Sequence, residues 1–155
     1  MLWEDLKESL IFLDTEETCK KEILERMGGA LIREGYAKDT YIRALLQREK
    51  DFPTGLDIQG IGVAIPHTEP CHVKKEGMAL AVLKNPVTFR HMEDEKLKVD
   101  VRLIFMLAVL NPKTHLKHLQ CVLNMIQDAK VLGQLLTAKG PEDIIRIIKT
   151  KEEMS

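Results

Sequence analysis

The stretch "IQGIGVAIPHTEPCH", residues 58–72, decides the fold because its short apolar run stops at a proline that is followed at once by a histidine. A residue before proline favours extended backbone, so Ile65 is expected to lie in a strand. Pro66 fixes its own φ and has no N–H to donate, which ends the strand. His67 is therefore predicted at the C-terminal end of a strand, where α/β sheets usually bind their ligands.

Apolar segments on both sides of this stretch predict the other strands of a sheet. Residues 9–14 and 78–84 are short apolar runs, and residues 99–110, "VDVRLIFMLAVL", are expected to form the longest strand. Runs that are apolar without alternation are typical of a sheet covered on both faces. Residues 51–62 hold one proline and three glycines and follow neither the helical nor the strand period, so a loop is expected there.

Segments with helical spacing of apolar residues alternate with these strands. They predict helices at residues 15–35, 39–49 and 115–130, a short helix at 130–138, and a last helix that begins at Gly140 and Pro141. Thr15 is the expected start of the first helix and Gly35 its end. Helices on both faces of a central sheet make an α/β sandwich. No linker or repeat divides residues 1–155, so a single domain is expected.

Composition and charge exclude several classes of function. The chain has 155 residues, of which 23 are basic and 24 acidic, so no bulk positive field is available for a nucleic acid. The longest apolar run, residues 103–110, is far shorter than a membrane-spanning helix, so no direct membrane insertion is expected. The N-terminus lacks the basic start of a secretory signal. Three widely spaced cysteines without a CxxC motif fit a reducing compartment, so we expect a cytoplasmic location.

Polar groups around His67 predict an anion site. Thr68 and Glu69 follow the histidine, and Thr54 stands among glycine-flanked amides earlier in the chain. Hydroxyl and backbone N–H donors that converge beside an imidazole would form a cradle for a phosphate. A plainer alternative stays open at this point: His67 hydrogen-bonds a carbonyl at the strand end and has no chemical role.

Two further residues have the chemistry of a phosphate site. His115 is expected in or next to the first turn of a helix, where free N–H groups and the helix dipole favour an anion. Arg48 is expected at the end of a helix just before the glycine-containing loop, and a guanidinium can fork onto a phosphate. Both have structural alternatives. His115 would be a solvated first-turn side chain, and Arg48 would interact only with the C-terminal dipole of its helix.

A metal site and a cysteine nucleophile are weaker chemical alternatives. His115 and His118 share a helix face and, together with His67, could hold the zinc ion of a zinc-dependent hydrolase. No glutamate stands between the two helical histidines as it does in HExxH, so no metal is expected. Nothing in the sequence around Cys71 marks that residue as a nucleophile.

Four segments resemble the enzyme IIA proteins of the fructose/mannitol class in the bacterial phosphoenolpyruvate-dependent sugar phosphotransferase system (PTS). They are "GIGVAIPHTEP" at 60–70, "LLQREKDFPTGL" at 45–56, "HLKHLQCVLNMI" at 115–126 and "LLTAKGPEDIIRII" at 135–148, so the resemblance covers most of the chain. The first two segments look most like the galactitol-type members of this class.

The resemblance implies a fold, a reaction and a set of partners. The fold is a single-domain α/β sandwich with a central mixed sheet of about five strands. Proteins of this kind accept a phosphoryl group from the phosphocarrier HPr on a histidine and pass it to a cysteine of enzyme IIB. They thereby drive uptake and phosphorylation of a sugar through the membrane enzyme IIC, and they need no cofactor. The motif makes His67 the acceptor, as a tele-phosphohistidine, with His115 and Arg48 beside it and Thr54 and Thr68 as phosphate-binding support.

Two alternatives keep the fold and change the role. One is a regulatory, nitrogen-type enzyme IIA, whose phosphorylation state is the signal, and the other is a binding module with incidental histidines. A carrier that docks on two partners also needs an apolar rim around its histidine, for which Ile58, Ile61 and Val63 are the candidates.

Overall fold

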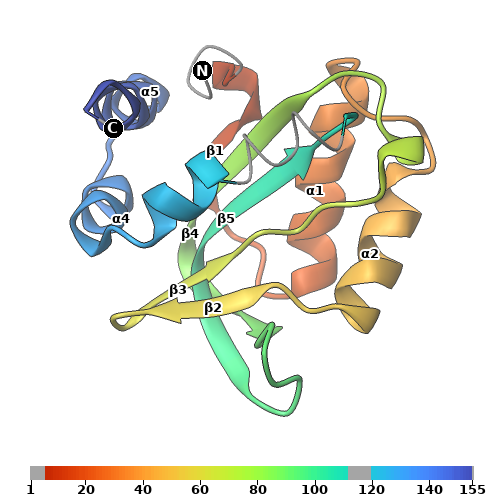
Figure 1. The fold of residues 1–155 in the computed structure, drawn as a ribbon, viewed down its shortest axis with the longest axis horizontal. Coiled ribbons are helices and arrows are strands. Elements are labelled where there is room, and N and C mark those ends of the chain that lie inside the picture. The colour runs from red at the N-terminus through yellow and green to blue at the C-terminus, as the bar shows by residue number, and fades with distance from the viewer. Residues whose placement is uncertain (1–5, 112–119, 155) are drawn as a thin grey trace.

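The computed structural model describes residues 6–111 and 120–154 of the chain (Figure 1). The strands are β1 Ile11–Thr15, β2 Gly55–Ile58, β3 Ile61–Ala64, β4 Gly77–Arg90 and β5 Lys98–Ala108. The helices include α1 Lys20–Arg33, α2 Tyr41–Asp51, α4 Ala129–Leu136 and α5 Pro141–Glu153, and residues 120–126 are also helical. Short 3-10 turns lie at Glu8–Leu10 and Pro70–His72.

The strands form one mixed sheet in the order β1-β4-β5-β3-β2. β1 pairs with β4 and β3 with β5 in parallel, whereas β4 with β5 and β2 with β3 are antiparallel. The predicted mixed sheet of five strands is confirmed. Because β3 and β5 run in parallel beside each other, their C-terminal ends meet at the same edge of the sheet.

Helices cover both faces of this sheet, so the predicted α/β sandwich is also confirmed. Along β4, Ala79 and Ala81 belong to the core cluster under α1 and α2, whereas Met78 and Leu80 belong to the cluster under α4 and α5. Alternate residues of one strand thus fill two cores, which is why the strand is apolar throughout. Figure 1 shows α1 and α2 on one side of the sheet and α4 and α5 on the other.

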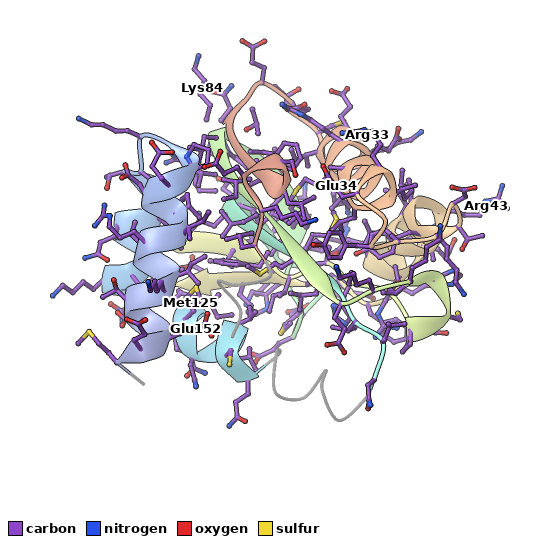
Figure 2. All side chains as sticks on the ribbon, turned by 90° about the horizontal axis from the view of Figure 1, so that it is seen from above. Arg33, Glu34, Arg43, Lys84, Met125 and Glu152 are labelled. Carbon is purple, nitrogen blue, oxygen red and sulfur yellow. The ribbon has the colours of Figure 1, made fainter. Side chains whose placement is uncertain are left out.

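Side chains occupy the space between the sheet and each layer of helices. Figure 2 shows Arg33, Glu34 and Arg43 with the α1 and α2 layer, and Met125 and Glu152 on the opposite side of the molecule. Among the described residues, no helix has both the length and the apolar character required to cross a bilayer.

The prediction of a loop over residues 51–62 is wrong for its second half, where the chain forms β2 and the turn into β3. Gln59 and Gly60 have φ angles of 52° and 91°, so the two strands are joined by a tight turn with two left-handed residues. The side chain of Asp57 accepts a hydrogen bond from Gly60 N at 2.8 Å. β2 has only four residues and begins at a glycine, so no strand period was visible.

Gly55 and Gly62 are needed because other strands approach them closely. A Cβ on Gly55 would lie 2.6 Å from the carbonyl oxygen of Arg90, and one on Gly62 would meet the carbonyl oxygen of Asp100. These two glycines were counted as signs of a loop, but they allow neighbouring strands to approach closely within the sheet.

Two other boundaries differ from the sequence prediction. The longest strand is β4, with 14 residues, and β5 has 11. β4 continues past a register shift between Val82 and Val87, where exposed Pro86 is tolerated because the ladder is interrupted. Thr15 ends β1 and does not start a helix, since α1 begins only at Lys20. The predicted end of that helix is confirmed, because Gly35 follows it with a φ of 84°.

Candidate functional site

His67 lies just beyond β3, at the C-terminal edge that β3 shares with β5. Leu107 N, in β5, donates a hydrogen bond to Pro66 O at 3.0 Å, and His67 forms an isolated parallel bridge with Leu107. Ile65 and Pro66 are buried, whereas His67 is partly exposed. β3 ends at Ala64, so Ile65, which was expected in the strand, lies just beyond it, and the predicted strand end at Pro66 is two residues too late. The histidine stands at the expected edge of the sheet.

One nitrogen of the His67 ring faces the backbone. Nδ1 is 2.8 Å from the carbonyl oxygen of Ile65. A carbonyl oxygen only accepts, so Nδ1 carries the hydrogen and donates it. In the neutral ring the lone pair then lies on Nε2, which makes Nε2 the nucleophilic nitrogen of this tautomer. The carbonyl contact that favoured a purely structural histidine thus also fixes which ring nitrogen carries the lone pair.

A buried polar cluster supports the strand that carries His67. Glu49, which is 3% exposed, accepts hydrogen bonds from Thr54 N and Thr54 Oγ1, both at 2.7 Å. Thr54 Oγ1 in turn accepts a hydrogen bond from Ile65 N at 3.2 Å. Burial raises the pKa of the Glu49 carboxyl, and the two bonds from Thr54 partly oppose that shift. This cluster ties α2 to the segment that ends at His67.

The two threonines expected to support a phosphate are both buried. The hydroxyl hydrogen of Thr54 is directed at Glu49, and Thr68 Oγ1 donates to Glu69 O at 3.0 Å. Either hydroxyl would have to give up its present bond in order to donate to a phosphate. Their role as phosphate ligands stays a prediction.

Arg48 lies in the last turn of α2, as expected. Its guanidinium carbon is 5.3 Å from the centre of the Phe52 ring, and Nη1 is 4.0 Å from Glu69 Oε1. Its Nε is buried and has no hydrogen-bond partner in residues 6–111 and 120–154. An N–H donor in this position is costly to leave unpaired, so the guanidinium has capacity for an additional acceptor such as a phosphate oxygen.

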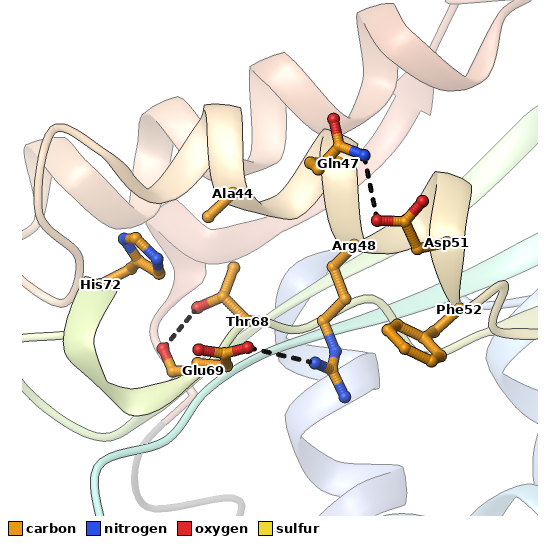
Figure 3. A pocket seen from close by; sticks show the side chains of 8 residues that line it. All are labelled: Ala44, Gln47, Arg48, Asp51, Phe52, Thr68, Glu69 and His72. Carbon is orange, nitrogen blue, oxygen red and sulfur yellow. Dashed lines mark hydrogen bonds and ion pairs between the residues drawn. The ribbon is translucent and has the colours of Figure 1, made fainter.

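Arg48 forms one wall of a cavity of about 240 Å³ (Figure 3). The lining side chains are Ala44, Gln47, Arg48, Asp51, Phe52, Thr68, Glu69 and His72. Thr68 and Glu69 follow His67 directly, so the cavity adjoins the segment that carries the histidine. Phe52 is 63% exposed at its rim, although the sequence analysis did not single it out.

His115, His118 and the helix start predicted at residue 115 lie outside the described residues. The role of His115 beside His67 therefore stays a prediction. In residues 6–111 and 120–154, no three His, Cys, Asp or Glu side chains stand together as metal ligands, and two members of the zinc alternative fall outside these ranges.

The expected apolar rim needs a correction. Val63 is fully buried in the core and cannot form a rim, because helices cover both faces of the sheet at β3. Ile58 and Ile61 are partly exposed but also pack against the core on the α4 and α5 side.

Sequence reasoning missed Glu49 and Tyr41 as parts of the site. Tyr41, Leu45 and Glu49 are the buried residues of α2, spaced by four, so they form one helical stripe. That spacing was the available signal, because a glutamate in register with two buried residues needs a polar partner inside the protein.

Comparison with known proteins agrees with this architecture. The chain is an α/β sandwich in which a proline and a partly exposed histidine follow the inner strand β3 at one edge of the sheet. Residues 4–151 match the family described as "Phosphoenolpyruvate-dependent sugar phosphotransferase system, EIIA 2". The chain belongs to this EIIA family, so the resemblance inferred from the sequence is confirmed.

Several relatives are similar over most of their length. The galactitol-specific EIIA component of Escherichia coli (strain K12) is 33% identical over 132 residues, which is 85% of this chain and 86% of that protein. The mannitol enzyme IIA of Escherichia coli, solved in complex with phosphorylated enzyme IIB, has a TM-score of 0.78 and 25% identity and covers 94% of this chain and 97% of its own. The nitrogen regulatory protein IIA-Ntr of Neisseria meningitidis has a TM-score of 0.74 and 30% identity, with the same coverages of 94% and 97%.

Proposed function

We propose that this protein is a phosphoryl carrier of a sugar phosphotransferase system. His67 accepts a phosphoryl group from phosphorylated HPr and transfers it to a cysteine of enzyme IIB, which serves the membrane enzyme IIC. The observation that carries this proposal is the 2.8 Å contact between His67 Nδ1 and Ile65 O, because it places the proton on Nδ1 and so makes Nε2 the ring nitrogen that attacks phosphorus.

The reaction consists of two in-line transfers. In the first, the Nε2 lone pair of His67 attacks phosphorus, an N–P bond forms, and the N–P bond to the donor histidine breaks with its electrons returning to the donor ring. In the second, the cysteine sulfur of enzyme IIB attacks phosphorus and the electron pair of the broken N–P bond returns to Nε2. Such transfers depend on positioning and on charge stabilisation. Both reacting groups are side chains, so the proposal includes no cofactor.

Arg48 supplies the charge in this proposal. Its Nε lacks a partner in the described part of the chain, and its contact with Glu69 is a long one at 4.0 Å. The guanidinium can therefore turn to the equatorial oxygens of the moving phosphoryl group. His115 is proposed as a second donor to those oxygens, and Thr54 and Thr68 as phosphate-binding support.

The substrate of the whole system is proposed from similarity. Among the relatives is a galactitol-specific EIIA component with 33% identity, so galactitol or a related sugar alcohol is the first candidate. We infer a cytoplasmic location from the three free cysteines, since unpaired cysteines are typical of reducing compartments.

A regulatory role is the second candidate function. It is favoured by the 30% identity to a nitrogen regulatory protein IIA-Ntr over 94% of this chain. Phosphorylation of His67 would be the same in both cases, and only the next step differs. Transfer of labelled phosphoryl from this protein to an enzyme IIB cysteine supports the transport role, and label that stays here with every enzyme IIB tested contradicts it.

Intact-protein mass spectrometry tests the proposed acceptor. The protein is incubated with phosphoenolpyruvate, enzyme I and HPr, and we expect one acid-labile phosphoryl adduct. The adduct should be absent in His67→Ala and present in His91→Ala, whose histidine lies in the β4–β5 connection. An unchanged adduct in His67→Ala would refute His67 as the acceptor.

A further inference from the structure

One face of α2 reaches the His67 segment through two polar side chains. Tyr41 and Glu49 stand at the two ends of the buried stripe, two helical turns apart, with Leu45 between them. A stripe that serves packing alone would be apolar, because a buried carboxylate loses its hydration. The polar ends therefore point to a further role for this face of the helix.

Tyr41 contacts strand β5, which is hydrogen-bonded to the residue before His67. Its hydroxyl is fully buried and donates to Leu107 O at 2.7 Å. Leu107 N donates to Pro66 O at 3.0 Å, so the strand that Tyr41 contacts also holds the residue before His67.

Glu49 is connected to the same segment through Thr54, whose hydroxyl contacts both Glu49 and Ile65. Thr54 Oγ1 donates its hydrogen to Glu49 Oε1 and accepts the N–H of Ile65 at 3.2 Å. Ile65 then supplies the carbonyl oxygen that accepts from His67 Nδ1. Three hydrogen bonds thus connect a buried carboxylate to the imidazole, with Thr54 and Ile65 as the only intermediates.

We propose that Glu49 is a positioning residue for His67, which acts through Thr54 to fix the carbonyl that selects the Nδ1–H tautomer. This inference rests on the proposed role of His67 as the phosphoryl acceptor. Glu49 itself does not touch the reacting atoms. Its carboxylate keeps the Thr54 hydroxyl oriented so that an oxygen lone pair faces Ile65 N.

A carboxylate suits this position because Thr54 directs two donors at it. Thr54 N and Thr54 Oγ1 each have their own oxygen of Glu49. A glutamine has one oxygen and would turn its NH₂ group toward one of these donors. Lys20 is the basic residue whose charge favours the ionised carboxylate across the fold. Arg48, the preceding residue, contacts Phe52 and Glu69 instead.

The chain offers a matched control for the Thr54 contact. Thr15, in edge strand β1, is also fully buried, and its Oγ1 accepts a backbone N–H, that of Lys84, at 3.4 Å. Thr15→Val and Thr54→Val therefore remove equivalent groups, but only the second lies in the path to His67.

The test combines histidine tautomer spectra with transfer kinetics. Two-bond ¹H–¹⁵N spectra of the unphosphorylated protein, assigned with His67→Gln, report the fraction of His67 with the proton on Nδ1. We expect Glu49→Gln and Thr54→Val to lower this fraction and to lower kcat for transfer from phosphorylated HPr about tenfold, with KM unchanged, because a misplaced nucleophile loses rate rather than binding. Thr54→Ser, which keeps the hydroxyl, should recover the Nδ1–H fraction.

The inference is overturned if Glu49→Gln and Thr54→Val keep the wild-type tautomer fraction, or if Thr15→Val changes it equally. Should Glu49→Gln fail to fold, the Thr54→Val and Thr54→Ser pair decides the question alone. The spectra need no phosphoryl transfer, so they separate this inference from the proposed function. A wild-type protein that takes up no phosphoryl group on His67 refutes the proposed function, whatever the tautomer fraction.

Discussion

Glu49 in α2 and Asp128 at the start of α4 each have a carboxylate that accepts two hydrogen bonds from residues that follow in the chain. The pKa values of these two carboxylates nevertheless shift in opposite directions. Burial raises the pKa of Glu49. The side chain of Lys151 and the backbone N–H groups of Lys130 and Val131 lower the pKa of Asp128, whose side chain is partly exposed. The partly exposed carboxylate stabilises the fold, whereas the buried one is costly and lies in the path to His67.

The two carboxylates lie in different layers of helices, Glu49 in the α1 and α2 layer and Asp128 at the start of α4 in the other layer. The α1 and α2 layer has polar side chains in its core that reach the strand ends at the candidate site, Tyr41 and Glu49. The buried residues of α4 and α5 are apolar throughout. We infer that one layer positions the histidine and that the other mainly supplies stability.

Matched truncations in the two cores should have the largest effect. Leu45 in α2 and Leu132 in α4 are both fully buried. Each substitution to alanine should lower the free energy of unfolding by about 2–5 kcal/mol, measured by urea denaturation. At a temperature where both variants are folded, only Leu45→Ala should slow phosphoryl transfer from HPr. Equal slowing by Leu132→Ala would remove the distinction between the layers.

Asp128→Ala should have the next largest effect. Asp128 Oδ1 accepts from Lys130 N and Val131 N at the start of α4, and Oδ2 accepts from Lys151 Nζ at 3.0 Å. Loss of such a cap costs about 1 kcal/mol. Since the folded-state pKa is lowered, this stability is present above the unfolded pKa and disappears as the pH falls through the folded value. Chemical denaturation of both proteins over a pH series measures it, and a difference that grows toward acid would contradict the assignment.

Glu49→Gln should show the opposite pH dependence. A raised carboxyl pKa means that the folded state binds the proton more tightly than the unfolded state. The free energy of unfolding of the wild type, relative to Glu49→Gln, should therefore be highest below the unfolded pKa and fall as the pH rises through the folded value. The same denaturation series detects this, and a relative stability that rises with pH would show that Glu49 is stabilised as a carboxylate.

Gln59→Gly should have the smallest effect. Gln59 adopts a φ of 52° in the β2–β3 turn, a conformation that costs a residue with a side chain about 1 kcal/mol and glycine almost nothing. We expect a slightly higher melting temperature and an unchanged transfer rate, since the turn lies at the opposite end of β3 from His67. A lower melting temperature would mean that the side chain of Gln59 makes a contact that outweighs its backbone strain.

Local chemistry explains which features the sequence predicted. The helix end at Gly35 and the start of α5 at Pro141 depend on the φ preferences of single residues, and both are as expected. β3 ends at Ala64, two residues before Pro66, so the proline predicted the strand end only to within two residues. The positions of His67 and Arg48 followed from such boundaries.

Features that depend on distant partners could not be predicted. Thr15 looked like a helix cap, but it is a strand residue whose hydroxyl accepts from Lys84, 69 residues later. β2 becomes a strand only through pairing with β3, and Val63 is buried only because both faces of the sheet are covered. The spacing of Glu49 marked it as buried, but its partner Thr54 was not identifiable before the fold placed the two together.

The most direct test of the central claim is the site of phosphorylation within the His67 ring. ¹⁵N and ³¹P NMR spectra of the protein phosphorylated by HPr distinguish phosphorus on Nε2 from phosphorus on Nδ1. Because Nδ1 donates to Ile65 O, we predict a phosphoryl group on Nε2 of His67. A phosphoryl group on Nδ1 of His67, or on another residue, would show that the contact with Ile65 O does not set the reacting nitrogen.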